Sequence, residues 1–314
     1  MGNKTKTRQQ YRKVGLVLSG GGIKAAAFHI GVCMALRDKG FTFVGGPKAQ
    51  VDKLLQQNKP NQIRTYVGSS AGAFVASILA GGYSLESLIN SFRLGSGEDA
   101  YFDKGDLQDL KPFGYRHIFS INSTGLLKFI PEGLFRRSVV TGGFETMIKN
   151  GLKLNGFFST EGVEKFLRKD ALVVNEFAQL GVELFVIGTQ LNHSRKVIFG
   201  NFSETWKTET NMYVHYASIS EAVACSAALP PVFKPYVLKR PDGKEMSFYD
   251  GEIRETLSAH VAADAGCDLV ISSYSVQPYH YTDAMGSLDR FGIPVIINQA
   301  LYQVIQQKIE KHIQ

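Results

Sequence analysis

Short runs of apolar residues alternate along the chain with longer stretches in which apolar side chains recur every three or four positions. Continuous apolar runs are typical of strands buried on both faces of a parallel sheet, and the periodic stretches are typical of amphipathic helices. This alternation predicts an α/β fold, a three-layer sandwich with a mostly parallel central sheet. The predicted strands are Val14–Leu18, Thr65–Val67, Val182–Thr189, Met246–Tyr249 and Asp268–Ser273.

Helical periodicity follows most of these runs. Ser84 is a predicted N-cap because a hydroxyl there can accept a hydrogen bond from the first turn of a helix starting at Leu85. Arg195–Phe199 is predicted to be a hairpin partner of the preceding strand or its continuation, and Pro294–Ile297 another short strand. The further predicted helices are Ala25–Lys39, Lys48–Gln57, Ala71–Ala80, Ser218–Pro231, Ile253–Ala265 and Leu301–Ile313.

The regular alternation breaks down between residues 93 and 160. Glycine, phenylalanine and basic residues are mixed there with weak periodicity, and Leu126–Pro131 is notably apolar. We interpret 93–160 as an insertion in a single domain formed by residues 14–314. Such an insertion either packs helically on the core or forms an apolar cap that receives acyl chains.

Composition places the chain among ordinary soluble globular proteins. It has 314 residues, of which 44% are hydrophobic and 20% charged, and its net charge is +7. Residues 1–13 contain lysines and arginines and no acid, which predicts a basic flexible arm, with contact to an anionic membrane or to nucleic acid as the alternative. We predict no nucleic-acid partner. The sequence has no membrane span and no cleavable signal, so we expect a cytoplasmic or peripheral membrane protein; secretion without such a signal stays open.

The cysteines and histidines do not form a metal-binding pattern. Cys33, Cys225 and Cys267 are far apart in apolar surroundings, which predicts reduced, buried thiols. The sequence contains neither C-x-x-C nor H-x-x-x-H. We therefore predict no metal and no cofactor.

The stretch Gly68–Gly72 has the form G-x-S-x-G with Ser70 at its centre, between an apolar run and a small-residue helix. A serine on a tight strand-to-helix turn adopts a strained conformation that needs small neighbours, and the two glycines meet that need. The turn exposes the hydroxyl at the helix N-terminus, which favours developing negative charge. The pattern predicts a nucleophile elbow, although G-x-S-x-G also occurs in plain loops.

A glycine loop, Ser19–Lys24, follows the first predicted strand and opens a helix, which makes it a suitable anion site. Gly20-x-Gly22-x-x-Ala25 fits a dinucleotide fingerprint, but a Rossmann site also needs an acid about 20 residues on. Phe41–Gly46 has no acid at its end. The other interpretation is an oxyanion hole, which accounts for the elbow one crossover later.

Asp250–Gly251 follows the fourth predicted strand. In a parallel sheet the carboxyl ends of strands share one edge, so we expect Asp250, Ser70 and the glycine loop to meet there. Partial burial would raise the pKa of the Asp250 carboxylate and make it a better base for the serine. A turn-forming Asp-Gly pair is the alternative.

Together these stretches resemble the patatin-like phospholipase family. Leu18–Lys24 matches its oxyanion motif, Gly68–Gly72 its elbow, and Asp250–Gly251 the D-G of its Ser-Asp dyad. Ser226–Phe233 resembles the segment before the catalytic aspartate, and Ala265–Ile271 the helix-to-strand passage after it. Order, spacing and context agree over much of the chain.

The resemblance spans about residues 14–272 and implies a patatin-like hydrolase without a catalytic histidine. Its substrates would be acyl esters of phospholipids or neutral lipids, as for a phospholipase A or lysophospholipase, with peripheral membrane contact; an activating protein partner stays open. Ser70 would be the nucleophile, Asp250 the base, and Lys24 would steady the loop or an anionic head group. The implied oxyanion hole is formed by Gly20, Gly21, Gly22 and Ile23.

Two residues depart from the family's motif, and two other functions compete with this prediction. Glu252 stands where the family commonly has glycine or alanine, which predicts a more crowded or more acidic pocket floor, and Ala25 replaces a frequent glycine. One rival is an α/β-hydrolase triad in which His280 or His260 joins Ser70 and Asp250. The other is a non-catalytic module, either nucleotide-binding or an adaptor.

Overall fold

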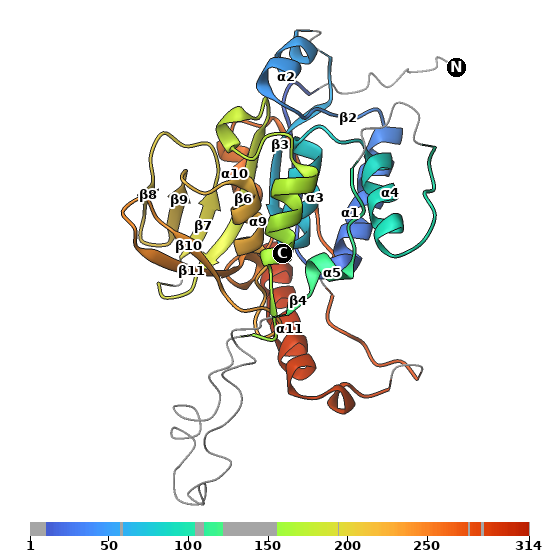
Figure 1. Cartoon of the computed structure of the whole chain (residues 1–314), viewed down its shortest axis with the longest axis vertical. Coiled ribbons are helices and arrows are strands. Elements are labelled where there is room, and N and C mark those ends of the chain that lie inside the picture. Colours follow the sequence, from blue (N-terminus) through green and yellow to red (C-terminus); the bar gives the residue numbers. More distant parts are fainter. Residues whose placement is uncertain are drawn as a thin grey trace, which may run out of the picture.

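The computed structural model describes residues 11–56, 59–103, 110–121, 156–193, 195–275, 277–283 and 286–313. The predicted basic arm, residues 1–13, lies outside these residues except for 11–13. The apolar stretch Leu126–Pro131 lies outside them entirely. The whole chain is drawn in Figure 1. Within the described residues, no helix is both long enough and apolar enough to span a bilayer.

The described strands form a ten-stranded sheet and a separate two-stranded ladder. The central order is β12-β1-β3-β6-β7-β9-β8, in which β12, β1, β3 and β6 run parallel. The short strand β2 pairs with β3, while β11 pairs with both β6 and β10. The strands are β1 (Val14–Leu18), β2 (Thr42–Phe43), β3 (Gln62–Ser69), β6 (Glu183–Gln190), β7 (Lys196–Phe199), β8 (Trp206–Lys207), β9 (Asn211–Val214), β10 (Tyr236–Lys239), β11 (Glu245–Asp250) and β12 (Leu269–Ser273), with β4 (Ser120–Ile121) and β5 (Phe158–Ser159) in the small ladder.

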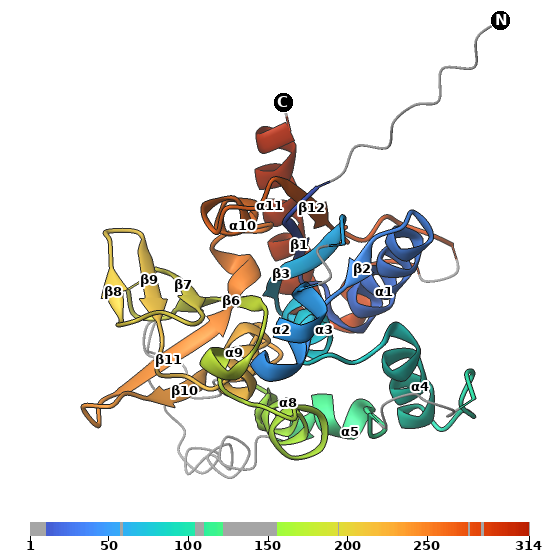
Figure 2. The same ribbon diagram turned by 90° about the horizontal axis from the view of Figure 1, so that it is seen from above.

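Helices cover both faces of the parallel part of the sheet. Figure 2 shows α10 and α11 on one side and α1, α3 and α9 on the other, which gives the predicted three layers. The helices are α1 (Gly22–Asp38), α2 (Lys48–Leu55), α3 (Ala71–Ala80), α4 (Leu85–Gly95), α5 (Tyr115–Ile118), α8 (Glu161–Phe166), α9 (Ile219–Ser226), α10 (Ala259–Asp264) and α11 (Ile293–Ile313). The α/β class with a mostly parallel sheet is confirmed.

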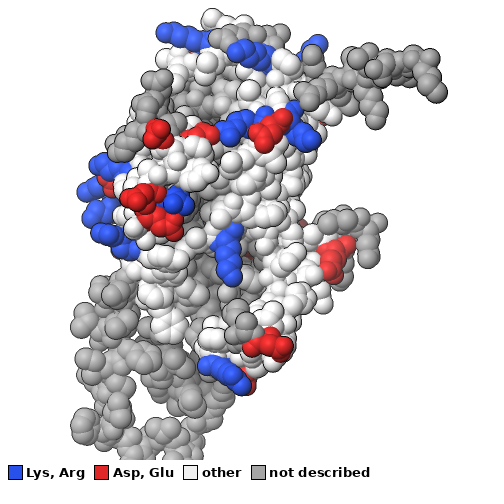
Figure 3. Space-filling view, turned by 90° about the vertical axis from the view of Figure 1, so that its right-hand side faces the viewer, with Lys and Arg blue, Asp and Glu red and all other residues white. Residues whose placement is uncertain are grey.

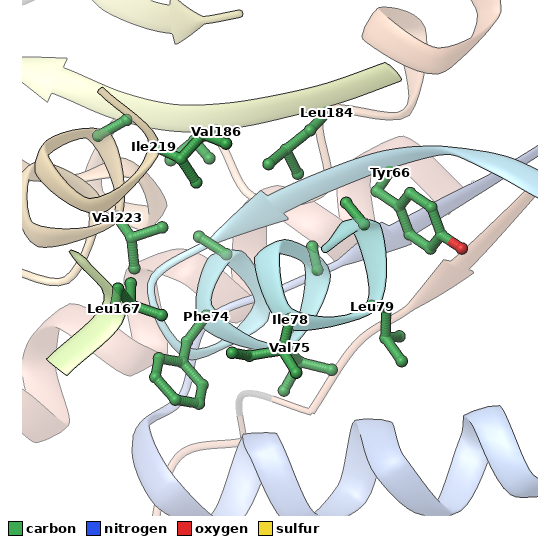
Figure 4. Close-up of a cluster of buried hydrophobic side chains, with 14 of the residues drawn as sticks. Tyr66, Phe74, Val75, Ile78, Leu79, Leu167, Leu184, Val186, Ile219 and Val223 are labelled. Carbon is green, nitrogen blue, oxygen red and sulfur yellow. The ribbon is translucent and has the colours of Figure 1, made fainter. Parts of the chain in front are cut away.

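Alternating side chains of the strands supply two separate cores. Leu16 and Leu18 of β1 join the larger core around α3, whereas Val17 between them packs in a smaller cluster with Val261 of α10. Successive side chains of a strand point to opposite faces, so each strand can anchor both helical layers. The larger core, in which α3 lies against β3, β6 and α9, is shown in Figure 4.

Local signals placed several elements correctly. Ser84 is the N-cap of α4, since its side chain accepts a hydrogen bond from the Ser87 backbone N–H. The strand predicted at 195–199 is β7, which pairs antiparallel with β6 and is therefore a hairpin partner. Ser218, the first residue of another predicted helix, caps α9 in a capping box with Glu221.

Two predicted elements are wrong. Pro294–Ile297 is the first turn of α11 and not a strand, because proline is well accommodated at a helix start, where its missing N–H has no intrahelical partner. The helix predicted to begin at Ile253 begins at Ala259, after a 3₁₀ turn over Gly251–Ile253. Leu257 has a positive φ of 55°, which interrupts a continuous helix there.

The predicted insertion is described only in part. Its described residues form the end of α4, α5 and the β4–β5 ladder. Phe113 packs against Phe74 of α3 with ring centroids 4.4 Å apart and against Phe166 of α8 at 4.7 Å. This part of the insertion therefore packs on the main core; the division into an arm, a domain and an insertion remains a prediction.

Candidate active site

Ser70 lies on the tight turn between β3 and α3. Its backbone has φ 51° and ψ −121°, which is strained for a non-glycine residue. A Cβ at Gly68 would lie 2.6 Å from the Ala73 nitrogen, and one at Gly72 would lie 2.3 Å from the Leu18 carbonyl oxygen. Both glycines are thus required by close backbone approach, as the elbow prediction supposes.

Ser226 at the end of α9 holds this turn in place. Its hydroxyl accepts a hydrogen bond from the Ser70 backbone N–H at 2.7 Å and donates one to the Ile187 carbonyl of β6 at 2.5 Å. The turn is therefore tied to the neighbouring strand. Ser226 belongs to a stretch that resembles the family, but its position in the sequence did not predict its hydrogen bonds to Ser70 and Ile187.

Asp250 ends β11, which pairs antiparallel with the last residues of β6. Asp250 pairs with Gly188, and Ser69 on the other side of β6 pairs with Ile187. The expectation of a parallel strand before Asp250 is wrong, yet the aspartate reaches the same edge because β11 enters the sheet from the carboxyl end of β6.

The Asp250 carboxyl group is buried, with 1% of the residue exposed. Its Oδ1 accepts a hydrogen bond from the Glu252 backbone N–H at 3.0 Å, and the side chain also interacts with Ser70. Burial raises the pKa of Asp250 to about 7, against the lowering effect of Ser70 and of the Glu252 N–H. The predicted nucleophile and base thus meet in the structure.

The glycine loop leads from β1 into α1, beside Ser70. Gly21 and Gly22 have φ values of 129° and 70°, which favour glycine. Gly22 and Ile23, in the first turn of α1, line the same pocket as Ser70, and N–H groups in a first turn have no intrahelical partner. The Gly20 N–H instead donates to Glu252 Oε1 at 2.7 Å, so it is already occupied and does not face a substrate. Lys24 is exposed on α1.

His29 of α1 is fully buried behind this loop. Its ring nitrogens lie 2.8 Å from the Ser19 carbonyl oxygen and 2.7 Å from the Ser273 hydroxyl at the end of β12. Burial lowers the pKa of His29, so the neutral ring donates to the carbonyl and accepts from the hydroxyl. His29 therefore connects the start of the glycine loop to the neighbouring strand.

An apolar pocket opens at Ser70. It encloses about 560 Å³ of empty space, including the part open to solvent. Residues from the first turn of α1, from α3 to α5 and from α8 and α9 line it: Gly22, Ile23, Ala26, Ser70, Ala71, Phe74, Phe92, Phe113, Ile118, Thr160, Val163, Val223, Ala227 and Phe233. Such a lining suits a hydrocarbon chain whose polar end lies at the serine.

The two histidines of the rival triad lie in different surroundings. His260 Nε2 lies 2.6 Å from Lys196 Nζ, and its Nδ1 lies 3.2 Å from Glu255 Oε1. His280 is exposed in the loop after β12. The structure brings neither ring into hydrogen bonding with Ser70 or Asp250 among the residues it describes, so the geometry favours the dyad.

Within the described part of the chain, no three or more His, Cys, Asp or Glu side chains gather as a metal-binding group. All three cysteines are free thiols. Cys33 and Cys225 are buried as predicted, whereas Cys267 is only half-buried.

A family model described as Patatin-like phospholipase matches residues 16–263. The chain belongs to the patatin-like phospholipase family. The match includes the glycine loop, the elbow, Asp250 and most of the fold around them. No curated protein matches the chain. The sequence of this patatin-like phospholipase did not predict the contact between Glu252 and Gly20. The only signal was that Glu252 departs from the family's motif.

Proposed function

We propose that the protein is a serine lipid acyl hydrolase of phospholipase A or lysophospholipase type, which cleaves fatty-acyl esters of membrane lipids through a Ser70–Asp250 dyad. The observation that carries the proposal is the buried Asp250 carboxyl group, which interacts with Ser70 where Ser70 lines an apolar pocket. Membership of the patatin-like phospholipase family supports the same chemistry.

In the proposed reaction, the Asp250 carboxylate accepts the Ser70 proton while the serine oxygen attacks the acyl carbonyl carbon. An aspartate whose pKa is raised to about 7 accepts a proton more readily than an ordinary carboxylate. The carbonyl π pair moves to the oxygen, and the resulting oxyanion is stabilised by N–H groups in the Gly21–Ile23 turn.

The tetrahedral intermediate then collapses and releases the alcohol part of the lipid, which takes the proton from Asp250. The acyl group stays on Ser70 while its chain occupies the apolar pocket. Water repeats the sequence with Asp250 as base, which releases the fatty acid and restores the serine. Both steps use the same two side chains, so loss of either one should stop turnover.

Access from a membrane surface is part of the proposal. Figure 3 shows the side of the molecule that carries α1 and α4; acidic and basic side chains form a row across its upper part, one basic side chain lies near its middle, and much of the remaining surface is uncharged. Exposed Lys24 lies in the first turn of α1 and is suitably placed to meet an anionic head group.

The test is lipid-product mass spectrometry after incubation of wild type and Ser70→Ala with mixed membrane lipids. We expect fatty acid and deacylated lipid with wild type and neither with Ser70→Ala, and the products would identify the substrate class. Equal product from both proteins would reject the proposed nucleophile. Binding of a nicotinamide nucleotide without any ester hydrolysis would favour the rival module.

A further inference from the structure

Glu252 connects the two halves of the site. It lies in the 3₁₀ turn after β11 and is 3% exposed. Its backbone N–H donates to Asp250 Oδ1 at 3.0 Å, and its side-chain Oε1 accepts from the Gly20 N–H at 2.7 Å. One residue thus touches both the base and the loop of the oxyanion hole.

The side chain of Glu252 also fills the space between the glycine loop and the elbow. A Cβ at Gly20 would lie 2.6 Å from Glu252 Cγ and 2.9 Å from Ser70 Cβ. The three residues are therefore in close contact, and removing the carboxyl-bearing side chain would leave both a gap and an unpaired N–H beside the nucleophile.

The surroundings of this carboxyl group favour its neutral form. Burial, with the nearby charge of Asp250, raises the pKa of Glu252 to about 8. The hydroxyls of Ser69 and Thr256 lie beside it. Tyr274 after β12 and Tyr302 of α11 face the same region, and burial raises the pKa of both phenols, so they are uncharged near neutral pH.

Arg254 directly follows this turn, and two lysines contact groups in or near it. Lys308 of α11 donates to the Ile253 carbonyl at 3.0 Å, and Lys196 lies 2.7 Å from Glu255 Oε2. Both carboxyl groups receive a backbone hydrogen bond, Asp250 from the Glu252 N–H and Glu252 from the Gly20 N–H. Glu252 Oε2, however, is buried with no hydrogen-bond partner among the described residues, and the charge of Asp250 adds to burial in raising the Glu252 pKa. Of the two neighbouring carboxyl groups, Glu252 therefore keeps its proton to the higher pH, about 8 against about 7.

We propose that Glu252 is a positioning residue, whose neutral carboxyl group holds the glycine loop in register with Ser70 and leaves the negative charge on Asp250. The proposal rests on the proposed function of the site. When Glu252 ionises, a second negative charge stands next to Asp250 and near the developing oxyanion. Hydrolysis should therefore fall on the alkaline side, above about pH 8.

The kinetic test compares Glu252→Gln and Glu252→Ala, with Glu255→Gln as the matched control from the same segment. Glutamine keeps the acceptor for the Gly20 N–H and cannot ionise. We expect Glu252→Gln to retain kcat within about threefold at pH 7 and to show no decline in hydrolysis above about pH 8. Glu252→Ala should lower kcat roughly 10- to 100-fold with little change in KM, since the loop loses its register. Glu255→Gln should keep both the wild-type kcat at pH 7 and the decline in hydrolysis above about pH 8.

Stability gives a readout that needs no activity. The folded protein holds the Glu252 proton up to about pH 8, whereas the unfolded chain releases it near 4.5. Wild-type stability should therefore fall as pH rises through this window, relative to Glu252→Gln. We expect the Tm of Glu252→Gln minus that of wild type to increase between pH 5 and pH 9.

Distinct outcomes separate this inference from the proposed function. Full activity in Glu252→Ala, an unchanged alkaline fall in Glu252→Gln, or a Tm difference independent of pH would each overturn the role of Glu252. Absence of any Ser70-dependent hydrolysis in wild type would instead reject the proposed function, and the Tm comparison would still decide whether Glu252 is a buried neutral acid.

Discussion

Gly72 offers a quantitative test of the elbow. It lies in the first turn of α3, where a Cβ would be 2.3 Å from the Leu18 carbonyl oxygen and 2.5 Å from that of Ser19. Both atoms belong to the backbone at the end of β1 and cannot rotate away. Gly72→Ala must therefore push α3, with Ser70 at its start, away from β1.

Gly31→Ala is the matched control. Gly31 lies in α1, is exposed, and an added Cβ would meet nothing within 4 Å. Alanine in a helix is favoured over glycine by about 0.5–1 kcal/mol, so Gly31→Ala should stabilise the protein. Gly72→Ala has the same propensity gain, and the difference between the two variants isolates the steric cost, about 1–3 kcal/mol.

The assay is urea unfolding of both variants followed by circular dichroism, together with hydrolysis of a soluble acyl ester. We expect Gly72→Ala to be the less stable of the two by that margin and to lose roughly 10²-fold in kcat/KM, because Ser70 moves relative to Asp250. Equal stability and equal activity in the two variants would refute the argument that close backbone approach requires glycine in the elbow.

Three further predictions concern the base, the pocket and the histidines. Since Asp250 must be ionised to accept a proton, log kcat/KM should rise with pH up to about 7 and then level off until the fall expected above about pH 8, as measured in a pH–rate profile. Ala26→Leu should narrow the pocket and lower hydrolysis of long-chain relative to short-chain esters, whereas the exposed Ala27→Leu should not. His260→Ala and His280→Ala should each keep wild-type hydrolysis within about threefold; a loss of several orders of magnitude would restore the triad.

The sequence predicted the fold where local and global signals agree. Val14–Leu18 is a continuous apolar run and forms β1 with the predicted bounds, and Ala71–Ala80 forms α3 likewise. Pro294–Ile297 failed because a short apolar run has no periodicity that separates a strand from a helix. The three apolar side chains after the proline are exposed on α11, so the run did not mark a buried strand.

The motifs of the candidate site could be predicted from the sequence, but the hydrogen bonds that connect them could not. Ser70, Asp250 and the glycine loop were found because strand ends gather at one edge of a sheet. The contacts of Ser226 with Ser70 and of Glu252 with Gly20 link residues 156 and 232 positions apart. Such pairings depend on register and side-chain direction, which no local pattern in one sequence records.

The most direct test of the central claim is to find the reactive residue. Wild type, Ser70→Ala and Asp250→Asn would be treated with a long-chain alkyl fluorophosphonate, which phosphonylates activated serine hydroxyls and releases fluoride, and the adduct would be mapped by peptide mass spectrometry. The account predicts a single adduct on Ser70 in wild type, none in Ser70→Ala and strongly slowed labelling in Asp250→Asn. Labelling of another residue, or labelling of Ser70 at an equal rate without Asp250, would contradict it.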